Sequence, residues 1–145
     1  MTNVFNDQKR WMQGCSQTIN VFNEDQFRLY MRLIDEEYKE LKGADDSNDP
    51  LETLDALVDL LVVTLGAVTS MNADGEGAWN EVLRSNLSKI DRETGKVIKR
   101  ESDGKVLKPD DWDPPALSQF LDKEYVEYLD ERATNNLKNK DGGEF

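Results

Sequence analysis

The sequence of 145 residues lacks several residue types on which common catalytic and structural sites depend. It contains no histidine, which excludes Ser-His-Asp and Cys-His catalysis and the usual histidine-bearing zinc sites. Its single cysteine, Cys15, cannot form a disulfide within the chain and is most simply a small buried hydrophobic residue. Neither imidazole nor thiol chemistry is therefore expected.

The chain also lacks a long apolar run and an excess of basic residues. No stretch approaches the roughly 20 residues of a membrane span, and the polar residues 1–10 lack the apolar segment of a signal peptide. The 30 acidic residues outnumber the 18 basic ones, and the net charge of −12 argues against a nucleic-acid surface. We expect a soluble, cytoplasmic protein with no nucleic-acid or membrane partner. A local cluster of basic residues between Arg84 and Lys108 favours a small anionic ligand instead.

The length suits one domain with a real core but not two. Apolar periodicity predicts an all-α fold, with a single domain over residues 1–133 and a polar, disordered tail over residues 134–145. Only two of the helices are long and strongly apolar, so we predict a four-helix-bundle-type core that a second copy of the chain completes. The expected helices cover residues 4–15, 24–42, 50–71, 78–90 and 117–133.

Local signals refine this outline. Gly43 and the run to Pro50 predict a break between the two long helices, with Asp49 as the N-cap of the second. After the helix over 78–90 the period changes: residues 96–99 and 105–108 flank Ser102-Asp103-Gly104, a signal for a small β-hairpin excursion. Trp112 is the expected anchor of the extended segment that follows.

Acidic residues recur at helical spacing on the two long helices, where residues three, four and seven apart share one face. Two such faces brought together crowd like charges, and two charges about 4 Å apart repel by roughly 4 kcal/mol at an effective dielectric near 20. Cations relieve that repulsion, and Mg²⁺ prefers carboxylate and phosphate oxygens. The pattern predicts a Mg²⁺ site (Mn²⁺ being a possible substitute) for a phosphorylated substrate. The residues are Glu36, Glu37 and Glu40 in the first helix and Glu52, Asp55 and Asp59 in the second.

These residues resemble those of a known family. Glu36-Glu37-x-x-Glu40, followed after a loop by Glu52-x-x-Asp55, is similar to the EExxE and ExxD motifs of the all-α NTP pyrophosphohydrolases. The likeness is closest to the short MazG-like and phosphoribosyl-ATP-pyrophosphohydrolase-like proteins of phages and bacteria. The downstream segment Glu81-Val-Leu-Arg-Ser-Asn-Leu-Ser-Lys89 continues it, and the resemblance covers roughly residues 28–117.

The resemblance implies hydrolysis of a (d)NTP to the (d)NMP and pyrophosphate. It places metal ligands at Glu37, Glu40, Glu52 and Asp55, and it makes Glu36 the catalytic residue that orients or deprotonates water. A second alignment exists, because in other branches the ExxD aspartate directly precedes the apolar run, and Asp59 holds that place here. The literal motif favours Glu52 and Asp55, with Asp59 on the same face within about 60°.

Basic and amide side chains downstream are the candidates for binding the substrate phosphates. Asn86 and Lys89 lie three residues apart on one helix face, whereas Arg84 lies on another. Each of these residues also has a plain interpretation, as a charge that offsets the acidic surface or as part of a hairpin surface. Trp112 and the other two tryptophans can stack on a base, but core packing is the simpler interpretation. The phosphate-binding candidates are Arg84, Asn86, Lys89, Lys96, Arg100 and Lys105.

Two other functions remain open at this point. The same chemistry serves phosphoribosyl-ATP as substrate, and no residue pattern separates that substrate from a (d)NTP. A non-catalytic regulator that binds nucleotide is the alternative of a different class. The resemblance also implies a homodimer, or a homotetramer built from dimers, with the sites near the subunit boundary.

Overall fold

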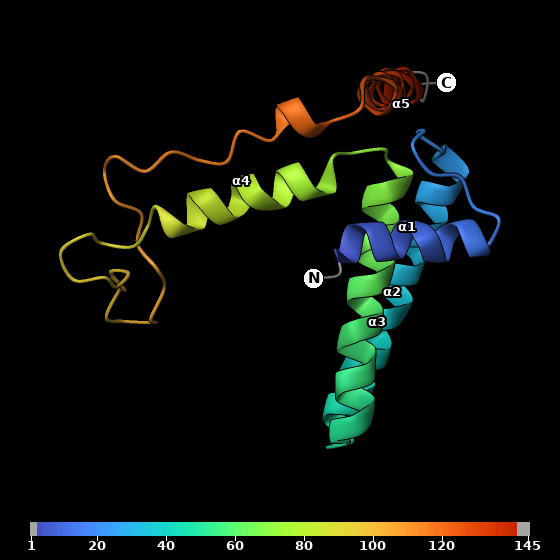
Figure 1. The fold of residues 1–145 in the computed structure, drawn as a ribbon. Helices are drawn as coiled ribbons and strands as arrows, with labels where there is room; N and C mark the ends of the chain where they lie inside the picture. The colour runs from blue at the N-terminus through green and yellow to red at the C-terminus, as the bar shows by residue number, and fades with distance from the viewer. Residues whose placement is uncertain (1–2, 142–145) are drawn as a thin grey trace. The chain divides into compact units, whose positions relative to one another are not determined.

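The computed structural model describes residues 3–141, and in that range every regular element is a helix. The all-α class predicted from the sequence is thus confirmed. The chain forms two compact units, the first comprising residues up to Gly75 together with those from Leu121 onward, and the second Glu76–Phe120. The helices are α1 (Val4–Gly14), α2 (Glu24–Asp46), α3 (Pro50–Ser70), α4 (Gly75–Leu87), the short 3₁₀ helix η1 (Ser118–Phe120) and α5 (Lys123–Asp141) (Figure 1).

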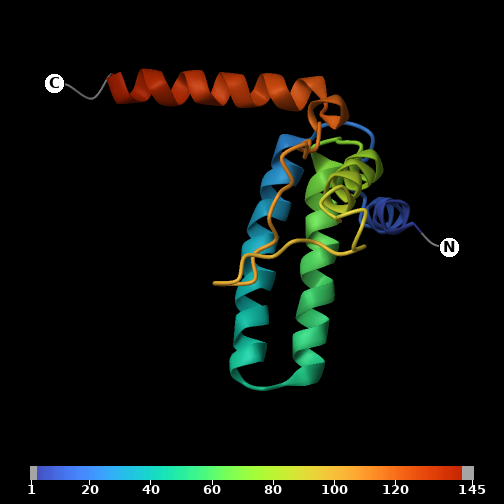
Figure 2. The same cartoon turned by 90° about the vertical axis from the view of Figure 1, so that its left-hand side faces the viewer.

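In the first unit, α2 and α3 form a helical hairpin whose two arms lie side by side (Figure 2). As predicted, Asp49 caps α3, because its Oδ1 accepts hydrogen bonds from the backbone N–H groups of Leu51 and Glu52, both at 3.1 Å. The predicted end of α2 near Gly43 is wrong by about one turn. The helix continues to Asp46, and the chain reverses at Asn48, whose φ is 53°. One glycine in a helix interior costs only about 1 kcal/mol, which the packed hairpin tolerates.

The core of the first unit lies where α1 packs on the hairpin. The ring of Tyr30 in α2 packs directly on Gly66 in α3, where an added Cβ would lie 2.1 Å from the ring. The Tyr30 hydroxyl donates a 2.6 Å hydrogen bond to Oε1 of Gln17, in the segment after α1. Cys15, which the sequence predicts as buried, instead is exposed at the end of α1. The buried apolar cluster consists of Met12, Phe27, Tyr30, Val63 and Ala67.

A polar network joins the start of α2 to the end of α3. The side-chain amide of Gln26 donates to the carbonyl of Thr18 and to the hydroxyl of the fully buried Ser70, both at 2.9 Å. The backbone N–H of Asn23 donates to the carbonyl of Ser70 at 3.0 Å. Since each of these buried polar groups has a partner, this end of the hairpin is fixed in register.

Helix α5 differs from its prediction at both ends. It begins at Lys123, where Asp122 accepts a hydrogen bond from the N–H of Glu124 at 2.9 Å, and the preceding residues form only the turn η1. It includes residues 134–141, which the sequence assigns to a disordered tail; residues 142–145 lie outside the described residues. Tyr125 holds α5 to the first unit, its ring packing edge-on against Phe22 and Phe27 with centroids 5.4 Å away in both cases.

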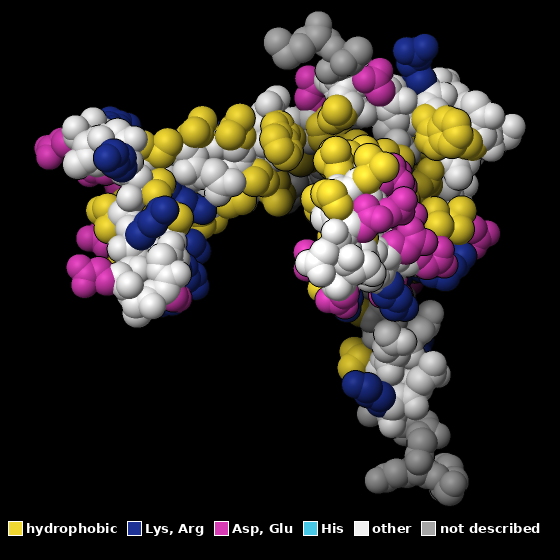
Figure 3. All heavy atoms as spheres, turned by 90° about the horizontal axis from the view of Figure 1, so that it is seen from below, with side chains coloured by type: hydrophobic (Ala, Val, Ile, Leu, Met, Phe, Trp, Pro, Cys, Tyr) yellow, Lys and Arg dark blue, Asp and Glu magenta, His cyan; other side chains and the backbone are white. Residues whose placement is uncertain are grey.

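The first half of α3 leaves apolar side chains exposed. The sequence predicts α3 to be buried nearly all round, but within one chain Leu51 is 75% exposed and Leu54 60%, and the neighbouring Leu57, Val58 and Leu61 are also exposed. Seen from the joined end of the hairpin, acidic and hydrophobic side chains gather next to each other (Figure 3). By length and composition, no single described helix could cross a membrane, and only α3 and α4 taken together meet that test.

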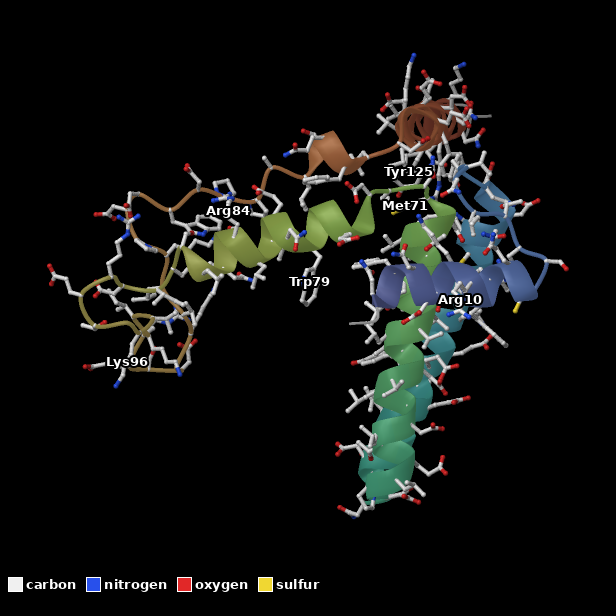
Figure 4. The ribbon with its side chains drawn as sticks, viewed as in Figure 1. Arg10, Met71, Trp79, Arg84, Lys96 and Tyr125 are labelled. Atoms are coloured by element: carbon white, nitrogen blue, oxygen red, sulfur yellow. The ribbon has the colours of Figure 1, made fainter. Side chains whose placement is uncertain are left out.

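The second unit consists of most of α4 and a long loop that returns to it. Its predicted hairpin is not shown as a pair of strands; the described residues contain only isolated antiparallel bridges, Lys99–Val106 and Ile90–Val97. Trp112 anchors the loop as predicted, donating from Nε1 to the carbonyl of Ser85 at 3.1 Å. Trp79, expected to face inward, is 63% exposed and points away from α4 (Figure 4).

Candidate active site

Glu37 is the most unusual carboxylate of the α2–α3 hairpin. Its side chain is half-buried, and its Oε2 atom is buried without any hydrogen-bond partner. The pKa of Glu37 is raised above its ordinary value, first by burial and then by the negative charges of Glu40 and Asp59, with a smaller effect from Glu36. The hairpin therefore holds a carboxylate oxygen that has no hydrogen-bond donor, which we call the orphan oxygen, and the neighbouring charges that act on Glu37 are negative.

These residues fit a divalent cation in their chemistry. A buried carboxylate oxygen without a donor is costly, and a cation satisfies it. The structure does not hold the ligands already converged, however, because no three acidic side chains among residues 3–141 stand close enough together to bind a metal ion. The carboxylates are thus chemically suited to Mg²⁺, but their side chains are not close enough together to bind the ion in this conformation.

The structure separates the acidic candidates of α3. Asp59 is the α3 residue whose charge acts on Glu37. Asp55 and Glu52, about one and two turns nearer the start of α3, line a surface hollow together with the exposed Leu51, Leu54 and Val58. Of the two alignments left open by the sequence, this arrangement favours the one that uses Asp59.

Glu36 lies on the outer side of α2. It lines a surface hollow with basic residues that include Arg28 and Arg32, and its charge helps to raise the pKa of Lys39. Lys39 itself pairs with Asp35 at 2.6 Å. Glu36 therefore borders the acidic set, and the ammonium group of Lys39 partly offsets its charge.

Two of the arginines proposed to bind phosphate are already paired with carboxylates. Arg84 makes a two-pronged interaction with Glu81, at 2.9 Å from Nε and 2.8 Å from Nη2. That guanidinium, with the N–H of Ala116 at 2.9 Å, lowers the pKa of Glu81 to about 2. Arg100 pairs in the same way with Asp103. Both arginines shape the second unit by closing local contacts.

The remaining basic candidates are placed differently. Asn86 and Lys89 come together as their spacing predicts, with Nζ of Lys89 2.9 Å from Oδ1 of Asn86. Lys96 and Lys105 are exposed in the loop, where Lys105 donates only its backbone N–H, to Asp103 at 3.1 Å. Lys96 is labelled in Figure 4. The structure thus brings Asn86 and Lys89 together and leaves the two loop lysines apart from them.

One basic residue was missed by the sequence interpretation. Nζ of Lys108 lies 4.1 Å from the centroid of the Trp112 ring, over which Lys89 also lies. No sequence signal indicates this contact, because no periodic spacing connects positions 89, 108 and 112.

Comparison with known families agrees with the acidic motif. The family described as phosphoribosyl-ATP pyrophosphohydrolase matches residues 1–86, more than half of the chain, a range that includes every acidic candidate. A comparison with curated proteins found no match. The acidic pair of helices and this match agree on one conclusion: the chain belongs to the phosphoribosyl-ATP pyrophosphohydrolase family, within the MazG-like all-α NTP pyrophosphohydrolases, and is a hydrolase of phosphoric anhydride bonds.

Proposed function

We propose that the protein is a Mg²⁺-dependent nucleotide pyrophosphohydrolase that converts a (d)NTP into the (d)NMP and pyrophosphate. The observation that carries the proposal is the orphan Oε2 of Glu37, buried beside Glu40 and Asp59. A carboxylate in this state is stabilised by a cation and is of no structural use without one. The family match supplies the reaction class, and the site supplies the reason for the metal.

Glu37, Glu40 and Asp59 would hold the Mg²⁺, with Glu52 and Asp55 completing the set from the exposed face of α3. When bound, the ion supplies the positive charge that offsets the charge on the phosphate oxygens. Glu36, beside the set and open to solvent, orients the attacking water and accepts its proton. The water oxygen forms the new bond to phosphorus, and the pyrophosphate leaves as the anhydride bond breaks.

We propose a phosphate-binding role for the basic and amide residues of the second unit. Lys89 with Asn86 is the central pair, and Lys96 and Lys105 offer exposed ammonium groups nearby in the sequence. Arg84 and Arg100 contribute less free charge, because each already has a carboxylate partner.

We also propose a homodimer, or a homotetramer built from dimers, in which a second copy covers the exposed first half of α3. Full burial of one leucine side chain contributes about 2 kcal/mol of favourable free energy. Burial of the exposed apolar side chains between Leu51 and Leu61 would therefore favour association with a second copy. Glu52 and Asp55 line a hollow in this same face, which supports the proposal that the acidic set lies at the edge of the interface. We propose a cytoplasmic location, with no nucleic-acid or membrane partner.

A second substrate is favoured by a specific observation. The matching family is described by its action on phosphoribosyl-ATP, which carries the same type of phosphoric anhydride. The two substrates differ at the base, whereas the acidic set and the basic residues are proposed to bind the metal ion and the phosphates. These residues therefore do not separate the two substrates.

The test is to incubate the protein with Mg²⁺ and each of the NTPs, the dNTPs and phosphoribosyl-ATP, and to separate the products by ion-exchange chromatography. We expect a monophosphate and pyrophosphate in equal amounts, no diphosphate, and no reaction when EDTA replaces Mg²⁺. The substrate with the highest kcat/KM decides between the two candidates. Release of diphosphate and orthophosphate, or no reaction with any of them, would contradict the proposal.

A further inference from the structure

Two lysines of the second unit converge on one aromatic ring. Nζ of Lys108 lies 4.1 Å from the centroid of the Trp112 ring, and Nζ of Lys89 lies 5.4 Å from it. The two ammonium groups are therefore within about 10 Å of each other, although the residues are far apart in the sequence. Folding has brought two like charges together.

Hydrogen bonds hold the indole ring of Trp112 in place. Nε1 of Trp112 donates to the carbonyl of Ser85, in the last turn of α4, at 3.1 Å. Ser85 is 2% exposed, and its hydroxyl donates to the carbonyl of Asp113, also at 3.1 Å. Since hydrogen bonds fix both the indole and its neighbour, the indole is a rigid platform for the two flexible lysine side chains.

The charges of the two lysines are not neutralised by the protein. The ion pairs between described residues leave out both of them, although Asp110, Asp111 and Asp113 lie next to Trp112 in the sequence. Lys89 contacts the neutral amide oxygen of Asn86, and Lys108 contacts the ring alone. An ammonium group has three donors, so hydrogen-bonding capacity remains on both side chains.

We propose that Lys108 and Lys89, positioned by Trp112, form a binding subsite for the phosphate groups of the substrate. Two ammonium groups within about 10 Å of each other suit a ligand with more than one negative charge, and neither of them forms an ion pair with a described carboxylate. Lys108 is then a phosphate-binding residue, Lys89 its partner, and Trp112 a positioning residue. That the ligand is a nucleotide rests on the proposed function; binding of the anion itself does not.

The experiment uses the full chain with Trp11 and Trp79 replaced by phenylalanine, which leaves Trp112 as the only tryptophan. Both replaced residues are more than 60% exposed, so the fold should survive, and far-UV circular dichroism checks this. Inorganic pyrophosphate is titrated in EDTA at low ionic strength while the Trp112 emission is recorded. EDTA removes any anion binding through a metal ion at the acidic set.

We expect a saturable change in emission, with about 10-fold weaker binding after Lys108→Gln. Lys108→Arg should retain most of the affinity, because the charge is kept. The matched control is Lys99→Gln, which removes the same charge from the same loop at a position away from Trp112 and should leave the affinity unchanged. With the best nucleotide, Lys108→Gln should raise KM more than it lowers kcat.

Three outcomes separate the two proposals. Equal pyrophosphate affinity for Lys108→Gln and Lys99→Gln, or an emission that does not saturate, would overturn the subsite. Pyrophosphate binding that depends on Lys108 in a protein that hydrolyses no nucleotide would leave the subsite standing and remove the proposed function. Hydrolysis with an unchanged KM in Lys108→Gln would remove the subsite and leave the proposed function standing.

Discussion

Charged side chains are paired differently in two regions of the molecule, the hairpin of α2 and α3 and the second unit. On the hairpin, Glu37 lies beside Glu40 and Asp59, and no basic side chain pairs with it among the described residues. In the second unit, Arg84 in α4 and Arg100 in the loop after it each pair with a carboxylate three residues away. One region gathers like charges, and the other cancels opposite ones.

The difference teaches which charges are available to a ligand. A pair three residues apart is made by the chain itself and stabilises a local turn, so its charge is already used. A crowded carboxylate without a donor gains nothing from the fold and becomes stable only with a partner from outside. By this criterion we propose Glu37 on the hairpin, and Lys89 and Lys108 over Trp112, as the binding groups.

The largest effect is expected from Glu37→Gln, which removes the central charge of the hairpin. Turnover with Mg²⁺ should fall by more than about 100-fold, since second-shell changes alone at metal sites already cost 10- to 100-fold. The metal-free protein should become more stable at the same time. The pKa of Glu37 is raised in the folded state, so its stabilising contribution is present while it is protonated at low pH and is lost as the pH rises through the folded pKa.

Thermal unfolding in EDTA measures this effect: between about pH 4 and pH 7, the Tm of the wild type should fall relative to that of Glu37→Gln. The control is Asp35→Asn, an exposed carboxylate on the same helix that pairs with Lys39. It should change neither turnover nor the pH dependence of Tm. Full activity in Glu37→Gln would show that the crowded carboxylate is not a ligand.

A smaller effect should separate the two alignments of the acidic motif. Asp59→Asn is expected to raise the Mg²⁺ concentration for half-maximal activity by about 10-fold or more, because Asp59 is the α3 carboxylate whose charge reaches Glu37. Asp55→Asn should have a weaker effect, since Asp55 lines the apolar hollow of α3. Mg²⁺ titrations of activity compare the two variants directly. The opposite order would restore the literal ExxD motif as the ligand set.

The local features of the fold were predictable, because the signals for them lie within a few residues. Asp49 followed by Pro50 marked the start of α3, and the apolar spacing found both arms of the hairpin. The end of α2 was missed because Gly43 has no contact that requires a break, so packing along the hairpin outweighed its low helix propensity. The exposure of Leu54 and Leu57 could not be predicted from the apolar pattern of α3, which suits a buried helix.

The site was predictable in its acidic half and less so in its basic half. Spacing indicated Glu37 and Glu40, but which α3 carboxylate has a charge that acts on Glu37 depends on how α2 and α3 pack. Glu81 stands three residues before Arg84, a signal for a local ion pair that the family resemblance outweighed. The contact of Lys108 with Trp112 is set by the path of the whole loop, and no sequence pattern records it.

The smallest effect is expected where the chain cancels its own charge, at Glu81. The Arg84 guanidinium and the Ala116 N–H hold its pKa at about 2, so the contribution of the carboxylate to stability is present above its unfolded pKa of about 4.3. That contribution should be lost as the pH falls from about 4 to about 2, which Trp112 emission in the single-tryptophan protein can follow. Glu81→Gln should remove this acid transition and lower the Tm by a few degrees at pH 7, while Mg²⁺ affinity stays unchanged. If Glu81→Gln weakened Mg²⁺ binding as strongly as Asp59→Asn, Glu81 would belong to the metal site, and the division between cancelled and available charge would not hold.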